Sequence, residues 1–188
     1  MSRLPLVLTL SRLVAGVAFL PLVFWRVPAW VLIGLLVAGL LSDIADGIIA
    51  RRLGVATLAL RRLDTRADML FYGGALVAAP FRASFPLALL WPWLAAYALL
   101  FVARNLVDYF RYRASPAYHM WSGKLWSVVL FVHLVALFCG AQALFLLPLA
   151  FACYAVNAAE GIVASLVLPR PCTDVPTVWH ALILTPST

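Results

Sequence analysis

Charged residues are scarce in this chain. They make up 11% of its 188 residues, whereas hydrophobic residues make up 65%, and soluble domains are about a quarter charged. Mean hydropathy is +1.03. The chain also lacks internal repeats, low-complexity tracts and linkers long enough to separate domains. This composition excludes an ordinary soluble enzyme and indicates a protein whose solvent is lipid.

Cysteine and acidic residues are also few. The three cysteines, Cys139, Cys153 and Cys172, are odd in number and widely spaced, so they indicate neither a disulfide framework nor a zinc site. We interpret them as packing residues. Seven acidic residues stand against 14 Lys and Arg, for a net charge of +7. Because almost no solvated face is available to display these cations, they argue against nucleic-acid binding and instead report membrane topology.

Six apolar segments have the length of a membrane span, which requires about 20 residues. They cover residues 4–25, 29–52, 64–81, 86–104, 121–140 and 143–168. The first is too long for the apolar core of a signal peptide and contains Arg12, so we interpret it as a helix, with cleavage as the minor alternative. We predict an all-α integral membrane protein with a six-helix domain, 1–168. The cytoplasmic tail, 169–188, is too short to span, and is either disordered or on the surface.

The basic residues predict the orientation of these spans. With a cytoplasmic N-terminus, only Arg26 and Arg82 fall outside, whereas twelve basic residues fall inside: Arg3, Arg12, Arg51, Arg52, Arg61, Arg62, Arg66, Arg104, Arg111, Arg113, Lys124 and Arg170. Such an asymmetry favours both termini inside. Trp121 and Trp126 then lie near the inner interface, as expected of an aromatic belt.

Four carboxylates are concentrated at the predicted cytoplasmic end of the second segment and the start of the third: Asp43, Asp46, Asp64 and Asp68. A carboxylate at membrane depth costs about 2.5–3.5 kcal/mol on insertion scales, and neighbouring carboxylates repel one another. Divalent cations or bound arginines would remove that cost. Taken singly, Asp64 is also explained as a helix N-cap, and the first two aspartates as partners of Arg51, Arg52, Arg61 or Arg62.

The spacing of these residues favours one shared site. On a helix, Asp43, Asp46, Gly47 and Ala50 are spaced i, i+3, i+4 and i+7, so two carboxylates and two minimal side chains lie on one face. A glycine costs about 1 kcal/mol relative to alanine in a helix. The presence of Gly47 is explained if a ligand approaches the backbone closely at this position. The two aspartates of the third segment are four residues apart. Both helices therefore aim oxygens at one volume, and hard oxygen ligands select magnesium or manganese over zinc.

At these residues the sequence resembles the CDP-alcohol phosphatidyltransferase family, whose signature runs D-x2-D-G-x2-A-R-x8-G-x3-D-x3-D. The positions that match in type and spacing are Asp43, Asp46, Gly47, Ala50, Arg51, Asp64 and Asp68. Leu60 stands where the family has its second glycine. Weaker similarities extend over most of the chain. They are Pro5, Leu8, Thr9 and Arg12 of a P-N-x-L-T-x-x-R start, with Leu6 in place of its asparagine, and Gly123 and Lys124 of a G-K-x-K-T segment.

The resemblance implies a transferase of phospholipid biosynthesis. It would move a phosphatidyl group from a CDP-linked lipid to a small alcohol acceptor and release CMP, as a phosphatidylglycerophosphate synthase does. The four aspartates would hold two divalent cations, Mg²⁺ or Mn²⁺, and Asp68 would also be the catalytic base. The implied donor-binding residues are Gly47, Ala50 and Arg51. The resemblance further implies a homodimer, and we expect it in a bacterial inner membrane with the active site facing the cytoplasm.

Other polar residues have two readings each. Arg104, Arg111, Arg113 and Lys124 lie around the predicted connection between the fourth and fifth spans. Cytoplasmic loops carry such cations without catalysis, but family members that use glycerol phosphate or inositol phosphate carry cations in this region, so an acceptor phosphate is the alternative. Glu160 and His133 either line a polar path or are structural, Glu160 pairing with a loop arginine and His133 packing neutral against a neighbouring helix.

Two other functions stay open. A transporter or channel would use the carboxylates as an ion path, although such sites usually lie near the membrane midplane between repeated halves. A non-catalytic scaffold would keep the fold and lose the donor site, for which Leu60 is the sequence argument. The four retained aspartates argue against it, since buried carboxylates without a role are costly.

Overall fold

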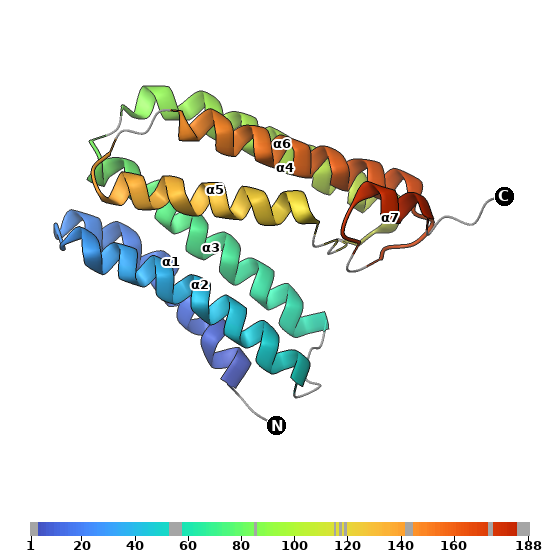
Figure 1. Cartoon of the computed structure of the whole chain (residues 1–188), viewed down its shortest axis with the longest axis horizontal. Helices are drawn as coiled ribbons and strands as arrows, with labels where there is room; N and C mark the ends of the chain where they lie inside the picture. The colour runs from blue at the N-terminus through green and yellow to red at the C-terminus, as the bar shows by residue number, and fades with distance from the viewer. Residues whose placement is uncertain are drawn as a thin grey trace. The chain divides into compact units, whose positions relative to one another are not determined.

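A computed structural model of the chain describes residues 4–52, 58–84, 86–114, 116, 118, 120–141, 145–172 and 175–183. Helices are the regular elements of these residues, which include no strand (Figure 1). They are α1 (Leu4–Phe24), α2 (Ala29–Arg52), α3 (Leu58–Arg82), α4 (Leu87–Tyr112), α5 (Trp121–Phe138), α6 (Leu146–Val167) and α7 (Val178–Ile183). The predicted all-α fold is confirmed.

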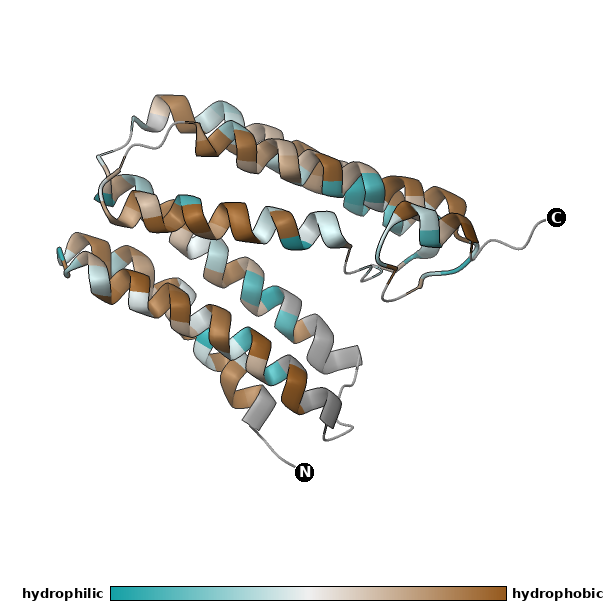
Figure 2. Ribbon diagram, viewed as in Figure 1, coloured by the Kyte–Doolittle hydropathy of each residue, from teal (hydrophilic) through white to brown (hydrophobic). Residues whose placement is uncertain are grey.

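Within the part of the chain that the structure describes, five helices are long and apolar enough to cross a membrane, namely α1, α2, α4, α5 and α6. Hydrophobic residues, coloured brown in Figure 2, recur along these helices, and the chain is an integral membrane protein. The remaining long helix, α3, has 25 residues, or about 37 Å at 1.5 Å per residue. It has the length of a span but not the composition, because five charged residues lie between positions 61 and 68.

Two helices extend beyond their predicted segments. α3 begins at Leu58, six residues before the predicted start at 64, and α4 continues to Tyr112 instead of ending near residue 104. α4 ends where Arg113 adopts a left-handed conformation, with φ 54°, and donates its backbone N–H to the carbonyl of Tyr109. Arg104 and Arg111, predicted near a connection, therefore belong to α4 itself.

The first compact unit contains α1, α2, α3 and residues 134–142. α1 and α3 cross with their backbones in contact at Gly16 and Gly74. A Cβ atom added to Gly74 would lie 2.0 Å from the carbonyl oxygen of Gly16, and one added to Gly16 would lie 2.6 Å from that of Leu70. Close approach through small residues is the usual way in which transmembrane helices pack.

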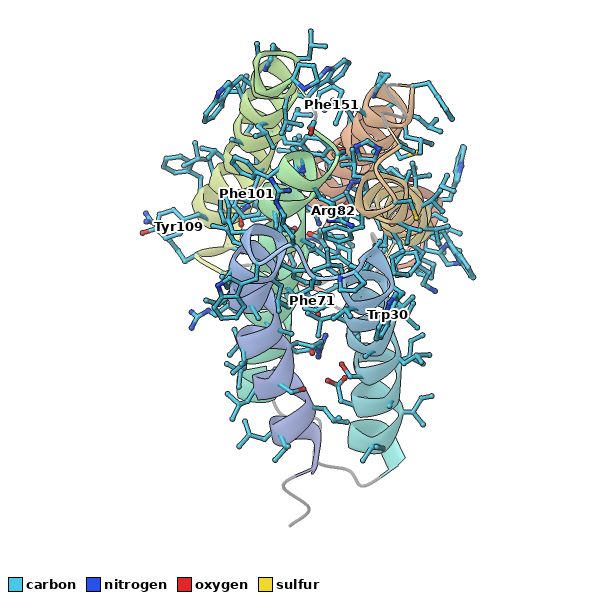
Figure 3. The ribbon with its side chains drawn as sticks, turned by 90° about the vertical axis from the view of Figure 1, so that its left-hand side faces the viewer. Trp30, Phe71, Arg82, Phe101, Tyr109 and Phe151 are labelled. Atoms are coloured by element: carbon cyan, nitrogen blue, oxygen red, sulfur yellow. The ribbon has the colours of Figure 1, made fainter. Side chains whose placement is uncertain are left out.

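Phe71 joins α2 to the same crossing. Its buried ring packs edge-to-face on Phe19 of α1, with centroids 5.3 Å apart. A Cβ added to Gly39 of α2 would lie 2.1 Å from that ring, so the absence of a side chain at Gly39 makes room for it. Figure 3 shows Phe71 between the ribbons of α1 and α2. The three helices are thus held together about one turn from Arg12, since Gly16 is four residues further along α1.

The second compact unit contains α4, α6, α7 and the first part of α5. Aromatic rings pack its helices together, since Tyr97 of α4 lies against Phe151 and Tyr154 of α6 at centroid distances of 5.3 and 5.0 Å. Trp126 of α5 also packs on Tyr154, at 5.1 Å. At the end of the unit, a cluster of buried residues connects α6 to the chain before α5 and after α6: Tyr118, Met120, Ala164, Leu168, Val175 and Ala181.

Candidate functional site

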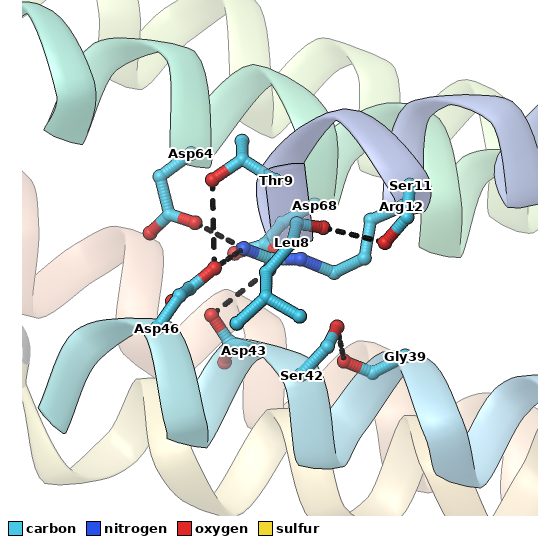
Figure 4. A network of polar contacts seen from close by, with 10 residues as sticks. All are labelled: Leu8, Thr9, Ser11, Arg12, Gly39, Ser42, Asp43, Asp46, Asp64 and Asp68. Carbon is cyan, nitrogen blue, oxygen red and sulfur yellow. Dashed lines mark hydrogen bonds and ion pairs between the residues drawn. The ribbon is translucent and has the colours of Figure 1, made fainter. Parts of the chain in front are cut away.

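Four aspartates from two helices converge on one arginine from a third. The guanidinium of Arg12 on α1 donates from Nη1 to Asp43 at 2.9 Å and from Nη2 to Asp46 at 2.5 Å, both on α2. The same two nitrogens also donate to the α3 carboxylates, Nη1 to Asp68 and Nη2 to Asp64. Figure 4 shows Arg12 in the middle of this group. The structure therefore brings together all four aspartates that the sequence singles out.

Burial divides the site into a floor and an opening. Arg12 is fully buried, and the side chain of Asp46 is only 5% exposed, whereas those of Asp43, Asp64 and Asp68 are 36, 33 and 32% exposed. Thr9, one turn before Arg12, directs its hydroxyl at the carboxylate of Asp46 at 3.5 Å. Arg12 and Asp46 form the floor, and the other three aspartates are accessible to a ligand.

The donor set suits a divalent cation. Asp43, Asp64 and Asp68 each have a carboxylate oxygen within 4.8 Å of the others. One arginine offsets only one of the four negative charges in the cluster when all are ionised, so the cluster retains an excess of negative charge. Hard carboxylate oxygens at such spacing are the ligands that Mg²⁺ and Mn²⁺ prefer. Asp46 lies outside this group of three and is bound to Arg12.

The predicted donor-binding residues lie next to the cluster in sequence. Gly47, Ala50 and Arg51 belong to α2, four to eight residues after Asp43, and Leu60 belongs to α3. The surroundings of Gly47 and the side chains of Ala50, Arg51 and Leu60 lie outside the part of the chain that the structure describes.

The predicted acceptor cations have different environments within the second unit. Arg104 donates from Nη1 to Asn157 at 3.1 Å, and Asn157 donates to Ser122 at 3.0 Å. A Cβ added to Gly161 would lie 2.7 Å from Nε of Arg104, so the guanidinium lies against the backbone of α6. This network joins α4, α5 and α6.

The other three cations are exposed. Arg111 lies in the last turn of α4, Arg113 is placed over the ring of Tyr109 at 4.8 Å, and Nζ of Lys124 lies 3.9 Å from the ring centroid of Trp121. Cation–π pairs of this kind contribute about 0.5–1 kcal/mol at exposed positions. Of the four predicted acceptor cations, Arg104 is therefore the one whose side chain is held in a polar network between helices.

His133 and Glu160 are two further polar residues that the sequence singles out. His133 is buried within α5, as expected of a packing residue. The ion pairs between two described side chains all involve Arg12, so Glu160 does not pair with any arginine whose side chain the structure describes. The interpretation of Glu160 as the partner of a loop arginine is not supported there.

A cluster of carboxylates that is accessible to a ligand, on the helices of a membrane protein, is typical of a site for cations or charged groups. The model of the CDP-alcohol phosphatidyltransferase family matches residues 2–163, and the chain belongs to this family. It is a transferase of substituted phosphate groups, acting on a CDP-alcohol donor and an alcohol acceptor in phospholipid biosynthesis. No curated protein and no solved structure matches the chain significantly.

Sequence reasoning missed the role of Arg12. The sequence indicates this residue only as a cytoplasmic cation and as part of a weak flanking similarity, and it offers the nearby arginines 51, 52, 61 and 62 as partners of the first two aspartates. The signal was present, because an arginine inside an otherwise apolar span must pair with an opposite charge or with backbone carbonyls. The chain has few carboxylates available for that role.

Proposed function

We propose that the aspartate cluster is the active site at which a phosphatidyl group passes from a CDP-linked diacylglycerol to a small phosphorylated polyol, with release of CMP. The observation that carries this proposal is the convergence of four aspartates from α2 and α3, three of them with oxygens within 4.8 Å of one another. A substrate with a diphosphate requires cations at such a site, since phosphate oxygens and carboxylates repel one another.

The accessible aspartates Asp43, Asp64 and Asp68 would hold a divalent cation, and Asp46 would contribute to a second. When bound, such ions neutralise charge on a diphosphate and stabilise the attacking and leaving oxygens of a displacement at phosphorus. Two Mg²⁺ or Mn²⁺ ions are the proposed cofactors, by resemblance to the family. Gly47, Ala50 and Arg51 would bind the CDP group, with Arg51 on the diphosphate.

Asp68 is the proposed catalytic base. The acceptor hydroxyl oxygen forms a bond to the β-phosphorus, the bond from that phosphorus to the oxygen of CMP breaks, and the hydroxyl proton passes to a carboxylate within hydrogen-bonding reach. The carboxylate of Asp68 is about one-third exposed, whereas that of Asp46 is nearly buried. Exposure therefore disfavours Asp46 for contact with the acceptor and is compatible with Asp68, which is chosen by resemblance to the family.

Arg12 is proposed to position the carboxylates. It contacts all four aspartates, and its own charge is buried. A buried cation that bridges two helices fixes the separation of their carboxylates, and loss of one partner of a buried pair typically costs about 3–5 kcal/mol. Arg12 thus keeps Asp43 and Asp46 of α2 in register with Asp64 and Asp68 of α3.

The proposed acceptor cations are Arg104, Arg111, Arg113 and Lys124. Arg104 is the principal candidate, because Asn157 fixes its guanidinium and a guanidinium binds phosphate oxygens in pairs. A phosphorylated polyol such as glycerol phosphate would match this charge. The exposed cations would attract the acceptor from solution.

The proposed membrane arrangement has six spans, with α3 as the sixth, and both termini in the cytoplasm. The charged first part of α3 carries the site, and the part of α3 that follows Asp68 is apolar apart from the terminal Arg82. We further propose a bacterial inner-membrane location, a cytoplasmic active site and a homodimer, all by resemblance to the family.

The test is a CMP-release assay on purified protein in lipid nanodiscs. CDP-diacylglycerol and Mg²⁺ or Mn²⁺ are supplied with glycerol phosphate, inositol phosphate, inositol, serine or other alcohols, one at a time. CMP release with a phosphorylated polyol, absent in EDTA, is the expected result. Release with serine or inositol alone would correct the acceptor. No release with any alcohol would overturn the proposal, and cation uptake into proteoliposomes without CMP chemistry would favour a transporter.

A further inference from the structure

The chain after α6 folds back onto the second unit. Val175 and Ala181 are buried in one hydrophobic cluster with Leu168, which follows α6, and Tyr118, which lies between α4 and α5. The backbone N–H of Trp121 donates to the carbonyl of Pro176 at 3.1 Å. This segment lies beyond residue 163, where the family match ends, so the family's chemistry does not account for it.

The short helix α7, Val178–Ile183, has two different faces. Ala181 is fully buried against the unit, whereas Trp179 and Ile183 are 74 and 79% exposed and Leu182 is 43% exposed. Six residues cannot cross a bilayer. α7 therefore presents large apolar side chains outward without being a span itself.

The ends of three membrane helices mark the level at which α7 lies. The hydroxyl of Tyr112, the last residue of α4, donates to the carbonyls of Ser165 and Leu168 at 2.8 and 2.7 Å, at the end of α6. Trp121 is the first residue of α5 and is bonded to the segment before α7. Candidate spans end or begin at all three places, so α7 is attached to the ends of these helices.

The side chains at this level are those of a membrane interface. Trp121 is exposed, and Lys124 lies over its ring. Arg113 directly follows α4, Arg170 lies three residues after the end of α6, and both are exposed. Tryptophan is enriched at the headgroup level, and clustered Lys and Arg there attract anionic lipids. An amphipathic helix with Trp on its apolar side binds in the plane of the interface.

We propose that α7 is an interfacial anchor, with Trp179, Leu182 and Ile183 inserted at the boundary between headgroups and acyl chains of anionic phospholipid. The residues after α6 are then bound to the membrane surface instead of forming a tail in water. The three inserted side chains lie outside both the aspartate cluster and the proposed acceptor cations.

Tryptophan fluorescence in nanodiscs tests the anchor. The emission of Trp179 is obtained by subtracting the fluorescence spectrum of Trp179→Phe from that of the wild-type protein. This substitution is at an exposed position and leaves the buried face of α7 intact. We expect phospholipid brominated near the carbonyl end of its acyl chains to quench most of this difference, and aqueous acrylamide to leave it nearly unchanged. Quenching should be stronger when the brominated lipid is anionic than when it is zwitterionic.

Two controls define the scale. Trp126, whose ring packs on Tyr154 inside the unit, should be quenched less than Trp179 when isolated by Trp126→Phe in the same way. Ile183→Trp in the Trp179→Phe protein moves the probe one turn along α7 and should restore the lipid-quenched emission. Quenching of Trp179 by acrylamide and not by brominated lipid would overturn the anchor, as would protection from both, which would indicate a second copy or other protein over α7. Equal quenching by both lipid types would overturn its preference for anionic lipid.

Discussion

Arg12 and the aspartates around it illustrate how one residue can decide the electrostatics of a site. A single guanidinium has two terminal nitrogens, and each of them serves one carboxylate from α2 and one from α3. This arrangement gives the buried Asp46 a charged partner and leaves three accessible carboxylates that repel one another. The excess of negative charge that remains beside Arg12 therefore favours a divalent cation at the site.

Asp68→Asn should abolish most turnover and preserve the fold. The amide is nearly isosteric but neither accepts the proton of the acceptor alcohol nor matches a carboxylate as a cation ligand, and loss of a general base typically lowers the rate about 10²- to 10⁴-fold. CMP release measures the effect, and the melting temperature in detergent checks the fold. Asp108→Asn is the matched control, because Asp108 is buried in the second unit, where it accepts a hydrogen bond from Ser165. Wild-type turnover in Asp68→Asn would refute the assigned role.

Arg12→Met should destabilise the protein most strongly when divalent cations are absent. The methionine fills part of the space but leaves Asp46 buried beside other carboxylates, at a cost of about 3–5 kcal/mol. Mg²⁺ should recover a larger part of the stability in the variant than it adds to the wild type. Thermal unfolding with EDTA and with Mg²⁺ measures both differences.

The same substitution at Arg66 is the control for Arg12→Met. Arg66 is exposed on α3 between Asp64 and Asp68 in sequence, so Arg66→Met should change the stability little in either buffer. An Arg12→Met protein as stable in EDTA as the wild type would show that the four ion pairs do not hold the site together.

The aspartates were predictable from the sequence because their positions on two helices follow from local periodicity alone. Spacings of three and four residues place side chains on one face whatever the helix packs against. The role of Arg12 was not predictable in this way, since it depends on which face of α1 meets α2 and α3. The face of α1 that meets the other helices is fixed by close contacts at Gly16, Gly39 and Gly74. These contacts exist only once the helices have packed together.

Among the elements, the crossing of α1 and α3 is the contact that places the site. Gly74 and its neighbour Gly73 differ sharply in surroundings: a Cβ at Gly74 would meet the backbone of Gly16, whereas one at Gly73 would meet nothing within 4 Å. The backbone of another helix cannot move aside as a flexible side chain can. A residue without a side chain is therefore required at position 74 for α1 and α3 to approach this closely.

Gly74→Ala should destabilise the protein, and Gly73→Ala should not. Overpacking of a close contact typically costs about 1–3 kcal/mol, whereas alanine in an open helical position gains up to about 1 kcal/mol over glycine. Unfolding of both variants in mixed detergent micelles compares them directly. Because the crossing lies close to Arg12, Gly74→Ala should also weaken CMP release. Equal stability of the two variants would show that α1 and α3 do not touch at these glycines.

The bounds of the helices were predictable where hydropathy changes abruptly and not elsewhere. α1, α2 and α5 agree with their predicted segments to within two residues at each end, because Pro, Gly or a polar turn follows an apolar run. α3 and α4 were predicted too short, because charged residues such as Arg61 and Arg111 were assigned to loops. Arginine is a good helix former, so a fall in hydropathy does not mark the end of the helix.

At the scale of the whole molecule, the number of crossings decides which face of the membrane each half of the chain meets. Composition supports five spans, and α3 has the length for a sixth. With five spans and a cytoplasmic N-terminus, α3 would not cross, and the end of α4 would be outside. With six spans, the end of α4 and the chain after α6 both face the cytoplasm, on the side that collects most of the basic residues.

Cysteine labelling from outside intact cells should place Arg82 outside and Arg111 inside. We expect six spans because the basic residues at and after the end of α4, such as Arg111, Arg113 and Lys124, lie on the cytoplasmic side only if α3 crosses. In a protein with Cys139, Cys153 and Cys172 replaced by serine or alanine, Arg82→Cys should react with an impermeant maleimide, whereas Arg111→Cys should react only after the membrane is permeabilised. Trp25→Cys, an exposed position in the α1–α2 connection, is external in either arrangement and serves as the reference. The opposite pattern at positions 82 and 111 would establish that α3 does not cross, and labelling at neither Arg82→Cys nor Trp25→Cys would reverse the proposed orientation.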